Sequence, residues 1–320
     1  MYRTLLIVLG VALAGCDPTS DNPPADTSVA DLSGDVSSDV SVDTAADSTA
    51  GGGPDSSAPD AATFDATVDS LPGTDAVSDL GVVPDAPDVA ISPVACAEAL
   101  ERVVTFQTDD GQTLAADFHP TGTANGPAVV LFHMIPPGND RTNYPADFRS
   151  LLVSRGIAVL NVDRRGAGAS SGKAIDAYQG PNGKLDVKAA MAFLATAPCP
   201  IDMNRVGLIG ASNGTTSVLD YTVYAATDPT SPAPAALVFL TGGTYTENQN
   251  SINANLELLS PLPLLFVYAS NEATWSKAFE LIGSMAWRFE QYTPGGHGTQ
   301  MFGIQPKSPA MVVDWLVGRL

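Results

Sequence analysis

Residues 102–319 alternate short apolar runs with segments of helical periodicity, and this alternation limits the chain to a small set of folds. Continuous apolar runs are typical of strands that are buried on both faces, as in parallel sheets. Such runs occupy residues 128–133, 157–162, 206–209, 236–240 and 264–268. Helical spacing is found over residues 144–155, 185–195, 215–225, 276–284 and 309–319.

A predicted hairpin precedes this alternation, with strands over residues 102–108 and 112–118 and the turn signal Asp109–Asp110–Gly111 between them. A short strand over residues 288–292 is expected near the end of the chain. Repeated β–α units of this kind predict an α/β fold, in which helices cover both faces of an open, mostly parallel sheet. Active sites in such sheets lie at the carboxyl ends of the strands.

Three motifs follow predicted strands directly. Gly210–Ala211–Ser212–Asn213–Gly214 has the form G-x-S-x-G and lies between a strand and a helix, where a serine hydroxyl is held exposed on a sharp turn. The octapeptide Asp163–Ser170 (DRRGAGAS) follows the strand over residues 157–162. His297, one of 3 histidines, stands in a glycine-rich turn after residues 288–292.

With these motifs in this order, residues 102–320 resemble the α/β-hydrolase superfamily, and in particular its lidless serine esterases and dienelactone hydrolases. The resemblance implies an α/β-hydrolase fold, with Ser212 as nucleophile and His297 as general base and acid. It also implies that Asp163 and Arg165 of the octapeptide fix a loop near the site without taking part in the chemistry. Residues 241–263, where many members insert a lid, leave room for one helix.

The base needs a carboxylate that orients it. The family carries this acid after the strand that is here residues 264–268, usually as G-x-x-D. The corresponding residues here are Ala269–Ser270–Asn271–Glu272, which makes Glu272 the expected acid. Glu247, after the strand over residues 236–240, is a competing candidate because some members keep their acid there.

The resemblance further implies an oxyanion hole made of two backbone N–H groups. One belongs to Asn213, directly after the serine. The family commonly supplies the other from a His-Gly-X turn, and this sequence has His133–Met134–Ile135. Ile135 is the donor by position, whereas Met134 is an alternative because it replaces the usual glycine. We expect His133 to hydrogen-bond this loop and His119 to be a strand-end residue.

The N-terminus predicts export. Arg3 precedes an apolar run over residues 4–13, which is too short to span a bilayer but suits a signal peptide. The run ends in Leu13–Ala14–Gly15–Cys16, which resembles the bacterial lipobox and implies that Cys16 carries lipid. We therefore expect a protein anchored to a membrane of the bacterial cell envelope, on its periplasmic or cell-surface side. A plain secretory signal with an incidental cysteine is the alternative.

Composition divides the rest of the chain into a signal peptide (residues 1–15), a linker (16–95) and a folded domain (96–320). Residues 17–95 hold 16 Asp and 9 Pro, no Lys or Arg, and Phe64 as their one aromatic residue, a composition typical of disorder. Residues 96–320 contain 14 basic and 19 acidic residues. This balance argues against nucleic acid as a partner. We expect a monomer.

Cys96 and Cys199 are an even pair once Cys16 is assigned to lipid, and the predicted compartment is oxidising. We therefore expect a disulfide between them, with two free buried thiols as the alternative.

The sequence contains no dinucleotide fingerprint, metal-ligand cluster or phosphate loop, so no cofactor or metal is expected. The predicted activity is that of a carboxylesterase-like or lipase-like serine hydrolase acting on a small-molecule or polymeric ester. Two alternatives stay open. One is a serine peptidase of the same fold. The other is a catalytically degenerate binding or structural lipoprotein, which the departures at Met134, Ala269 and Glu272 favour.

Overall fold

The computed structural model describes residue 96, residues 101–245 and residues 250–320. The predicted signal peptide, Cys16, the linker and Glu247 lie outside the described residues. The proposed boundaries after residues 15 and 95 therefore stay predictions.

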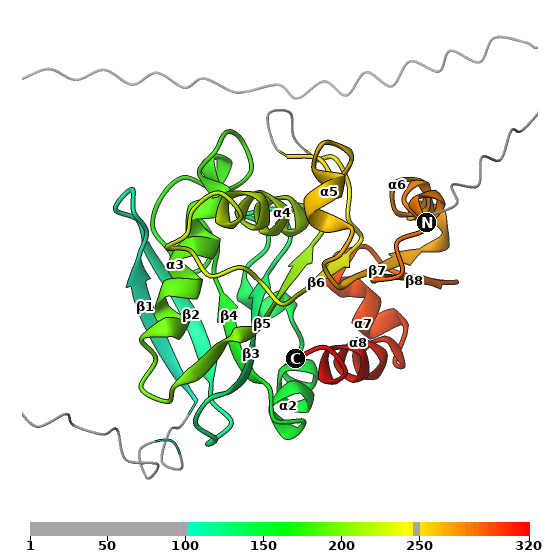
Figure 1. Cartoon of the computed structure of the whole chain (residues 1–320). Coiled ribbons are helices and arrows are strands. Elements are labelled where there is room, and N and C mark those ends of the chain that lie inside the picture. The colour runs from blue at the N-terminus through cyan, green and yellow to red at the C-terminus, as the bar shows by residue number, and fades with distance from the viewer. Residues whose placement is uncertain (1–95, 97–100, 246–249) are drawn as a thin grey trace, which may run out of the picture. The chain divides into compact units, whose positions relative to one another are not determined.

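A single mixed sheet forms the centre of the domain, with strand order β1-β2-β4-β3-β5-β6-β7-β8 (Figure 1). Strand β2 is antiparallel to both β1 and β4, and the strands from β4 to β8 are mutually parallel. The predicted hairpin and mostly parallel sheet are thus confirmed. The strands are β1 (Arg102–Gln107), β2 (Thr113–His119), β3 (Gly126–Phe132), β4 (Ala158–Val162), β5 (Ile201–Ala211), β6 (Ala236–Leu240), β7 (Leu264–Ala269) and β8 (Trp287–Tyr292).

Helices cover both faces of this sheet, with α3, α4 and α5 on one face and α2, α7 and α8 on the other (Figure 1). Among the described residues, no helix has the length and apolar character needed to cross a membrane. The helices are α2 (Ala146–Ser154), α3 (Gly183–Ala195), α4 (Gly214–Ala225), α5 (Leu256–Leu259), α6 (Ala273–Ala278), α7 (Met301–Ile304) and α8 (Ser308–Val317).

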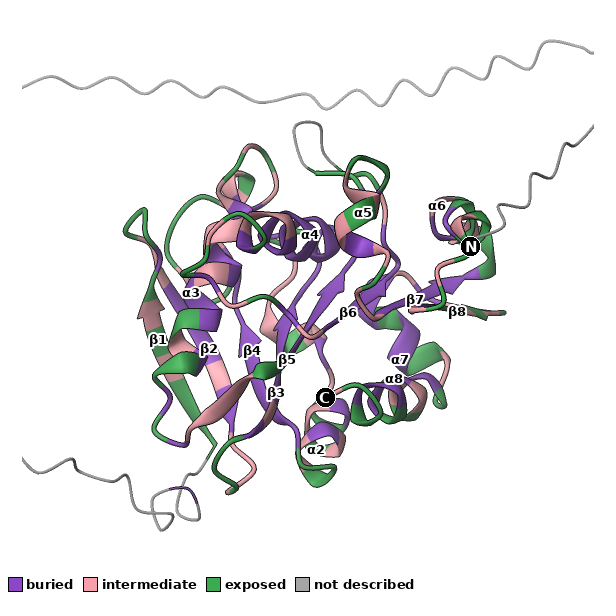
Figure 2. Cartoon of the chain, in the orientation of Figure 1, coloured by how far each residue is buried: buried purple, intermediate pink, exposed green. Residues whose placement is uncertain are grey.

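The core lies on both sides of the central strands, as the continuous apolar runs predict (Figure 2). In β3, Val130 and Phe132 join the cluster under α3 and α4, whereas Val129 and Leu131 join the cluster under α2 and α8. Each of these four side chains is 0% exposed. Burying one such side chain stabilises the fold by about 1.5–3 kcal/mol, so these strands form a rigid frame for the loops at their ends.

Two predicted elements differ from the structure in extent. Strand β5 begins at Ile201, five positions before the predicted strand, because its first part is partly exposed and lacks the apolar run. The predicted helix over residues 276–284 is instead α6, which ends at Ala278, followed by a 3-10 turn (Glu280–Ile282). Gly283 ends this turn with φ 69°, a conformation that glycine adopts without strain.

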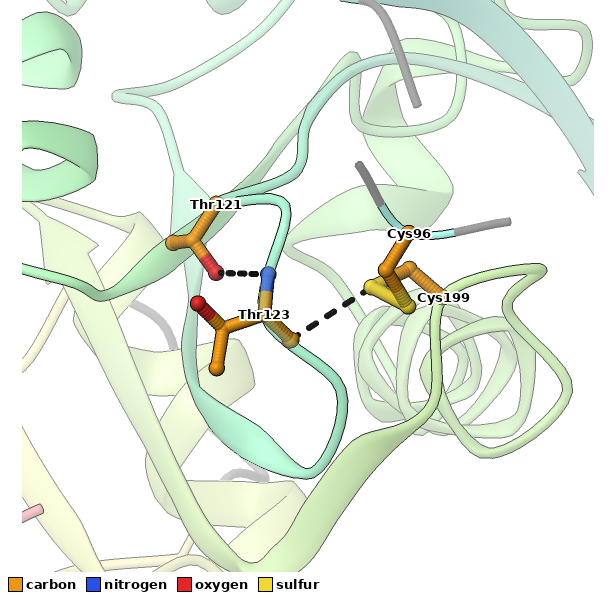
Figure 3. The surroundings of a disulfide bond; sticks show 4 residues. All are labelled: Cys96, Thr121, Thr123 and Cys199. Atoms are coloured by element: carbon orange, nitrogen blue, oxygen red, sulfur yellow. Dashed lines mark hydrogen bonds between the residues drawn. A yellow bond between two sulfur atoms is a disulfide. The ribbon is translucent and has the colours of Figure 1, made fainter. Parts of the chain in front are cut away.

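Cys96 and Cys199 form a disulfide in the structure, with their Cα atoms 4.8 Å apart and a sequence separation of 103 (Figure 3). The sulfur of Cys199 lies 3.5 Å from the carbonyl oxygen of Thr123. The backbone N–H of Thr123 in turn donates to the Thr121 hydroxyl, 3.4 Å away. The disulfide therefore joins the start of the described domain to the segment that leads into β5.

We predict that replacing both cysteines (Cys96→Ser with Cys199→Ser) lowers the free energy of unfolding by about 2–4 kcal/mol, because the unfolded chain regains the entropy of a long closed loop. Urea denaturation of the two proteins measures this difference. Reduction of the unmutated protein should produce the same loss, and equal midpoints before and after reduction would contradict the prediction.

Candidate active site

Ser212 stands on a sharp turn between β5 and α4. Its φ of 50° lies in the left-handed region, which costs a non-glycine residue about 1–3 kcal/mol. The turn closes because Gly210 and Gly214 have no side chains. A Cβ at Gly210 would lie 2.7 Å from the Gly214 carbonyl oxygen, and one at Gly214 would lie 2.5 Å from the Phe132 carbonyl oxygen. The G-x-S-x-G spacing thus brings strand, helix and the end of β3 together around the serine.

The structure brings Ser212, His297 and Glu272 together from the ends of three different strands. Ser212 Oγ lies 2.6 Å from His297 Nε2, and His297 Nδ1 lies 2.9 Å from Glu272 Oε1. A carboxylate only accepts, so Nδ1 carries the proton that it donates to Glu272, and Nε2 is left to accept from the serine hydroxyl. The competing acid, Glu247, lies outside the described residues.

Glu272 reaches the histidine from a short 3-10 turn (Ser270–Glu272) at the end of β7. Its second oxygen, Oε2, is buried, and no described residue donates a hydrogen bond to it. Ser212 is 5% exposed, so the hydroxyl lies just below the surface. A hydrogen-bonded Ser–His–carboxylate series of this form is the arrangement that activates a serine hydroxyl as a nucleophile.

His133 lies at the end of β3 and is fully enclosed. Its Nδ1 donates to the Met134 carbonyl oxygen 2.8 Å away, and its Nε2 accepts from the Arg164 backbone N–H at 2.9 Å. Burial and the neighbouring Arg164 guanidinium lower the pKa of His133 to about 3. The structure therefore places this histidine in the loop scaffold, as expected, and His133 is neutral at physiological pH.

Arg164 fixes the same loop with its side chain. The buried guanidinium donates to the carbonyl oxygens of His133 and Met134 (both 3.3 Å) and of Ala177 (2.7 Å), and to the Ser217 hydroxyl (2.9 Å). Burial lowers the pKa of Arg164 to about 10, so it remains charged at neutral pH. One cation thereby ties together the segments that follow β3 and β4 and the first turns of α4.

Asp163 and Arg165, the neighbours of Arg164 in the octapeptide, also anchor this loop. The Asp163 carboxylate accepts from the backbone N–H groups of Arg141 and Ala169, at 2.9 and 2.8 Å. Arg165 pairs with the buried Asp186 at 2.8 Å and with Asp110 at 2.7 Å. Asp163 and Arg165 thus contact loop and helix residues, which is the placement that the sequence predicts for them.

The backbone N–H groups of Asn213, Met134 and Ile135, the expected oxyanion donors, make no hydrogen bond to another described residue. Asn213 is the N-cap of α4, and N–H groups at a helix N-terminus lack intrahelical partners. The Met134 carbonyl faces His133 and Arg164. Because C=O and N–H point in opposite directions across a trans peptide, the Ile135 N–H is directed away from Arg164. The Met134 side chain packs against Gly298. A Cβ on this glycine would lie 2.7 Å from the Met134 sulfur.

Thr241 and Tyr245, which the sequence patterns did not single out, complete the surroundings of the serine. Thr241 has φ 52°, and its hydroxyl accepts from the Gly298 N–H at 2.9 Å, next to His297. The Tyr245 hydroxyl donates to the Thr241 carbonyl oxygen, and its ring meets the His297 ring edge-on with centroids 6.3 Å apart. Burial raises the pKa of Tyr245 to about 12, although a hydrogen bond to the Ser212 side chain opposes this shift.

His119, the remaining histidine, lies apart from the group formed by Ser212, His297 and Glu272. His119 ends β2, as expected, and its Nδ1 lies 3.2 Å from Glu101. Within the described ranges, no group of three or more His, Cys, Asp and Glu residues is placed to hold a metal ion.

The comparison with known proteins rests on structure. No protein-family model matches the sequence, and neither does any curated protein. An esterase from Pyrococcus furiosus superimposes with a TM-score of 0.54 over 70% of this chain and 93% of its own, at 17% identity. An α/β hydrolase from Vibrio vulnificus superimposes with a TM-score of 0.53 over 67% of this chain and 81% of its own, at 19% identity. A dienelactone hydrolase from Anabaena variabilis superimposes with a TM-score of 0.51 over 69% of this chain and 98% of its own, at 18% identity. This chain has the α/β-hydrolase fold.

Some of the site residues can be recognised from sequence motifs of the α/β-hydrolase fold, and others cannot. Ser212 and His297 follow strands of the fold within glycine-rich turns, and these turns are visible in the sequence. The signal that could have pointed to Thr241 is the pair Gly242–Gly243, which directly follows the buried strand β6. Tyr245 carries no comparable signal, because its contact with His297 depends on how the loop folds back.

We predict that His133 stays neutral, with its proton on Nδ1, down to about pH 4. The unfolded chain takes up this proton below pH 6.5, whereas the folded chain does so only near pH 3. Stability is therefore lost as pH falls through this window, by about 2 kcal/mol at pH 5. Nitrogen-15 NMR of the histidine rings measures the protonation state directly. Protonation of His133 near pH 6 would contradict the assignment.

Proposed function

We propose that this protein is a serine hydrolase that cleaves carboxylic esters through an acyl-enzyme. The observation that carries this proposal is the hydrogen-bonded series Ser212–His297–Glu272, in which Ser212 stands on the turn between β5 and α4. The likeness to an esterase and to a dienelactone hydrolase supports it at the level of the fold. Because both hydrogen bonds of this series are formed, we favour an active enzyme over a degenerate binding protein.

The reaction follows from the two histidine nitrogens. Ser212 Oγ attacks the ester carbonyl carbon while its proton moves to His297 Nε2. The imidazolium that forms is stabilised by Glu272 at Nδ1. His297 then returns the proton to the leaving alcohol, and an acyl-serine remains. A water molecule, deprotonated by the same nitrogen, releases the acid and restores Ser212.

The tetrahedral intermediate places a negative charge on the former carbonyl oxygen. We assign its stabilisation to the N–H groups of Asn213 and Ile135, for which the described residues provide no other acceptor. The carbonyls of His133 and Met134 both face Arg164, so the N–H groups of Met134 and Ile135 both point away from it, and we assign Ile135 because it occupies the last position of the His-Gly-X turn. Donors held in place before the reaction are worth about 2.7–4 kcal/mol each in such sites.

We further propose that lipid on Cys16 anchors the enzyme to a membrane of the cell envelope and that residues 17–95 separate the domain from the membrane. The lipobox-like sequence Leu13–Ala14–Gly15–Cys16 supports the anchor, and the Cys96–Cys199 disulfide fits an oxidising compartment. The substrate is then an ester that reaches the enzyme outside the cytoplasm.

We predict that a fluorophosphonate probe labels the full-length protein and that Ser212→Ala abolishes labelling. His297→Ala should lower both labelling and p-nitrophenyl ester hydrolysis at least 1000-fold, because the base is lost. Glu272→Gln, which keeps the shape of the side chain, should reduce kcat by about 100- to 10,000-fold. Labelling measured by gel fluorescence and ester turnover measured by absorbance test these values.

The matched control is Ser270→Ala, an exposed serine beside Glu272, which should label and turn over as the unmutated protein does. A folded protein that neither labels nor hydrolyses esters would overturn the proposed function. Turnover of peptides in preference to esters would assign the same site to a peptidase.

For the anchor, we predict that Cys16→Ser moves the protein from the membrane pellet to the soluble extracellular or periplasmic fraction. Lipidation requires the thiol, whereas the signal peptide is unchanged. Immunoblots of fractionated cells of the producing bacterium, with Cys199→Ser as the control, measure the shift. Retention of Cys16→Ser in the membrane fraction would contradict a lipid anchor.

A further inference from the structure

A cavity of about 260 Å³ lies beside the candidate active site, between α4, α6 and residues 250–253. Its apolar lining comes from Leu219, Phe239, Ile252, Trp275 and Phe279. The mechanism described above makes no use of this space.

The cavity is lined by parts of the segments that follow Ser212 and Glu272. Thr215 and Thr216, in the first turn of the helix that follows Ser212, line one side. Trp275, which comes three positions after Glu272, lines another. Gly243 lines it near Tyr245, where a Cβ would lie 2.8 Å from the tyrosine ring. Tyr245, whose ring meets His297 edge-on, therefore lies beside both the candidate active site and the cavity wall at Gly243.

Sheet order places the cavity and the Met134–Ile135 loop on opposite sides of the serine strand. The cavity is lined by β6 and by the segments that follow β6 and β7, on one side of the serine strand β5. The loop with Met134 and Ile135 follows β3, on the other side of β5. When the carbonyl oxygen is directed to the β3 side, both other substituents of the ester lie on the β6 side, where His297, which follows β8, takes the leaving group and the cavity is the space left for the acyl chain.

The lining also includes Thr244, Asn250, Ser251 and Asn253, and its aromatic residues offer a surface against which an apolar group can pack. Trp275 contacts Phe279 edge-on, with ring centroids 4.8 Å apart, and lies 6.3 Å from the Phe239 ring. Trp275 is held in place by its neighbour, since a Cβ on Gly242 would lie 2.4 Å from its ring. The Thr215 and Thr216 hydroxyls already donate to the carbonyl oxygens of Ser212 and Asn213, at 2.7 and 2.6 Å.

The volume sets the size of the group. A water-sized group takes about 30 Å³ in a liquid, and an apolar cavity of about 150 Å³ holds benzene. A space of 260 Å³ thus takes about eight non-hydrogen atoms. A hexanoyl, octanoyl or phenylacetyl group fits, and the chain of a palmitoyl group does not.

We propose that this cavity is the acyl-binding pocket of the enzyme, that it selects esters of medium-length or aryl-substituted short acids, and that Trp275 limits the length. This inference rests on the proposed hydrolase function. It gives the ester substrate a chemical class that the Ser–His–Glu series alone does not define.

The test is the acyl-chain dependence of kcat/KM for p-nitrophenyl esters from acetate to palmitate, measured on the full-length protein. We expect kcat/KM to rise by up to about fourfold per methylene to hexanoate or octanoate, and to fall at least tenfold by palmitate. Trp275→Ala should raise the ratio of dodecanoate to butyrate kcat/KM at least tenfold. Leu219→Phe, which narrows the cavity, should lower the ratio of octanoate to butyrate.

The matched control is Phe106→Ala, a half-buried aromatic residue on β1 at the opposite edge of the sheet, which should leave both ratios within twofold. A second series, acetate esters of methanol to hexanol, separates the two ends of the ester. Trp275→Ala should not change its profile. A change in the alcohol series without one in the acyl series would overturn the assignment.

The outcomes also separate this inference from the proposed function. Fluorophosphonate labelling of Ser212 with a flat acyl profile, unchanged by Trp275→Ala and Leu219→Phe, would overturn the acyl pocket while the hydrolase proposal stands. Absence of both labelling and turnover in the folded protein would overturn the hydrolase proposal and this inference with it.

Discussion

The buried guanidinium of Arg164 is the interaction on which the geometry of the site depends. A charged group removed from water is strongly destabilising unless its hydrogen bonds are replaced. Arg164 obtains four acceptors, three of them carbonyl oxygens and none a carboxylate. These acceptors come from the ends of β3, the loop after β4 and the start of α4. Arg164 Nε is buried without a partner among the described residues, so the charge relies on these four acceptors, which are available only when the segments lie in their observed positions.

That arrangement explains how the site tolerates its departures from the common sequence. Met134 departs from the glycine of the His-Gly-X turn that the sequence resembles, yet its carbonyl is fixed by Arg164 and His133, and its side chain fills the space beside Gly298. The longer Glu272 reaches His297 from a 3-10 turn. Both residues that the sequence presents as irregular thus make specific contacts with the loops they belong to.

Sequence patterns predicted the parts of this protein that depend on local chemistry. The strand over residues 236–240 coincides with β6, because it is a fully buried apolar run that ends at Thr241–Gly242. The turn around Ser212 was predicted from its glycines. The acid could be narrowed only to Glu272 or Glu247, since spacing does not show which carboxylate reaches the histidine. The roles of Arg164 and Tyr245 were not predictable, because their partners are distant in sequence and meet only in the folded chain.

The Cys96–Cys199 disulfide also determines where mechanical load enters the domain. Strand β1 lies at the edge of the sheet and pairs only with β2, so a pull on its N-terminal end would separate the two strands one hydrogen bond at a time. A pull applied to the chain before Cys96 is instead transmitted through the sulfur bridge to Cys199, next to the central strand β5. The edge hairpin is then bypassed, and tension from the preceding chain is borne by the interior of the sheet.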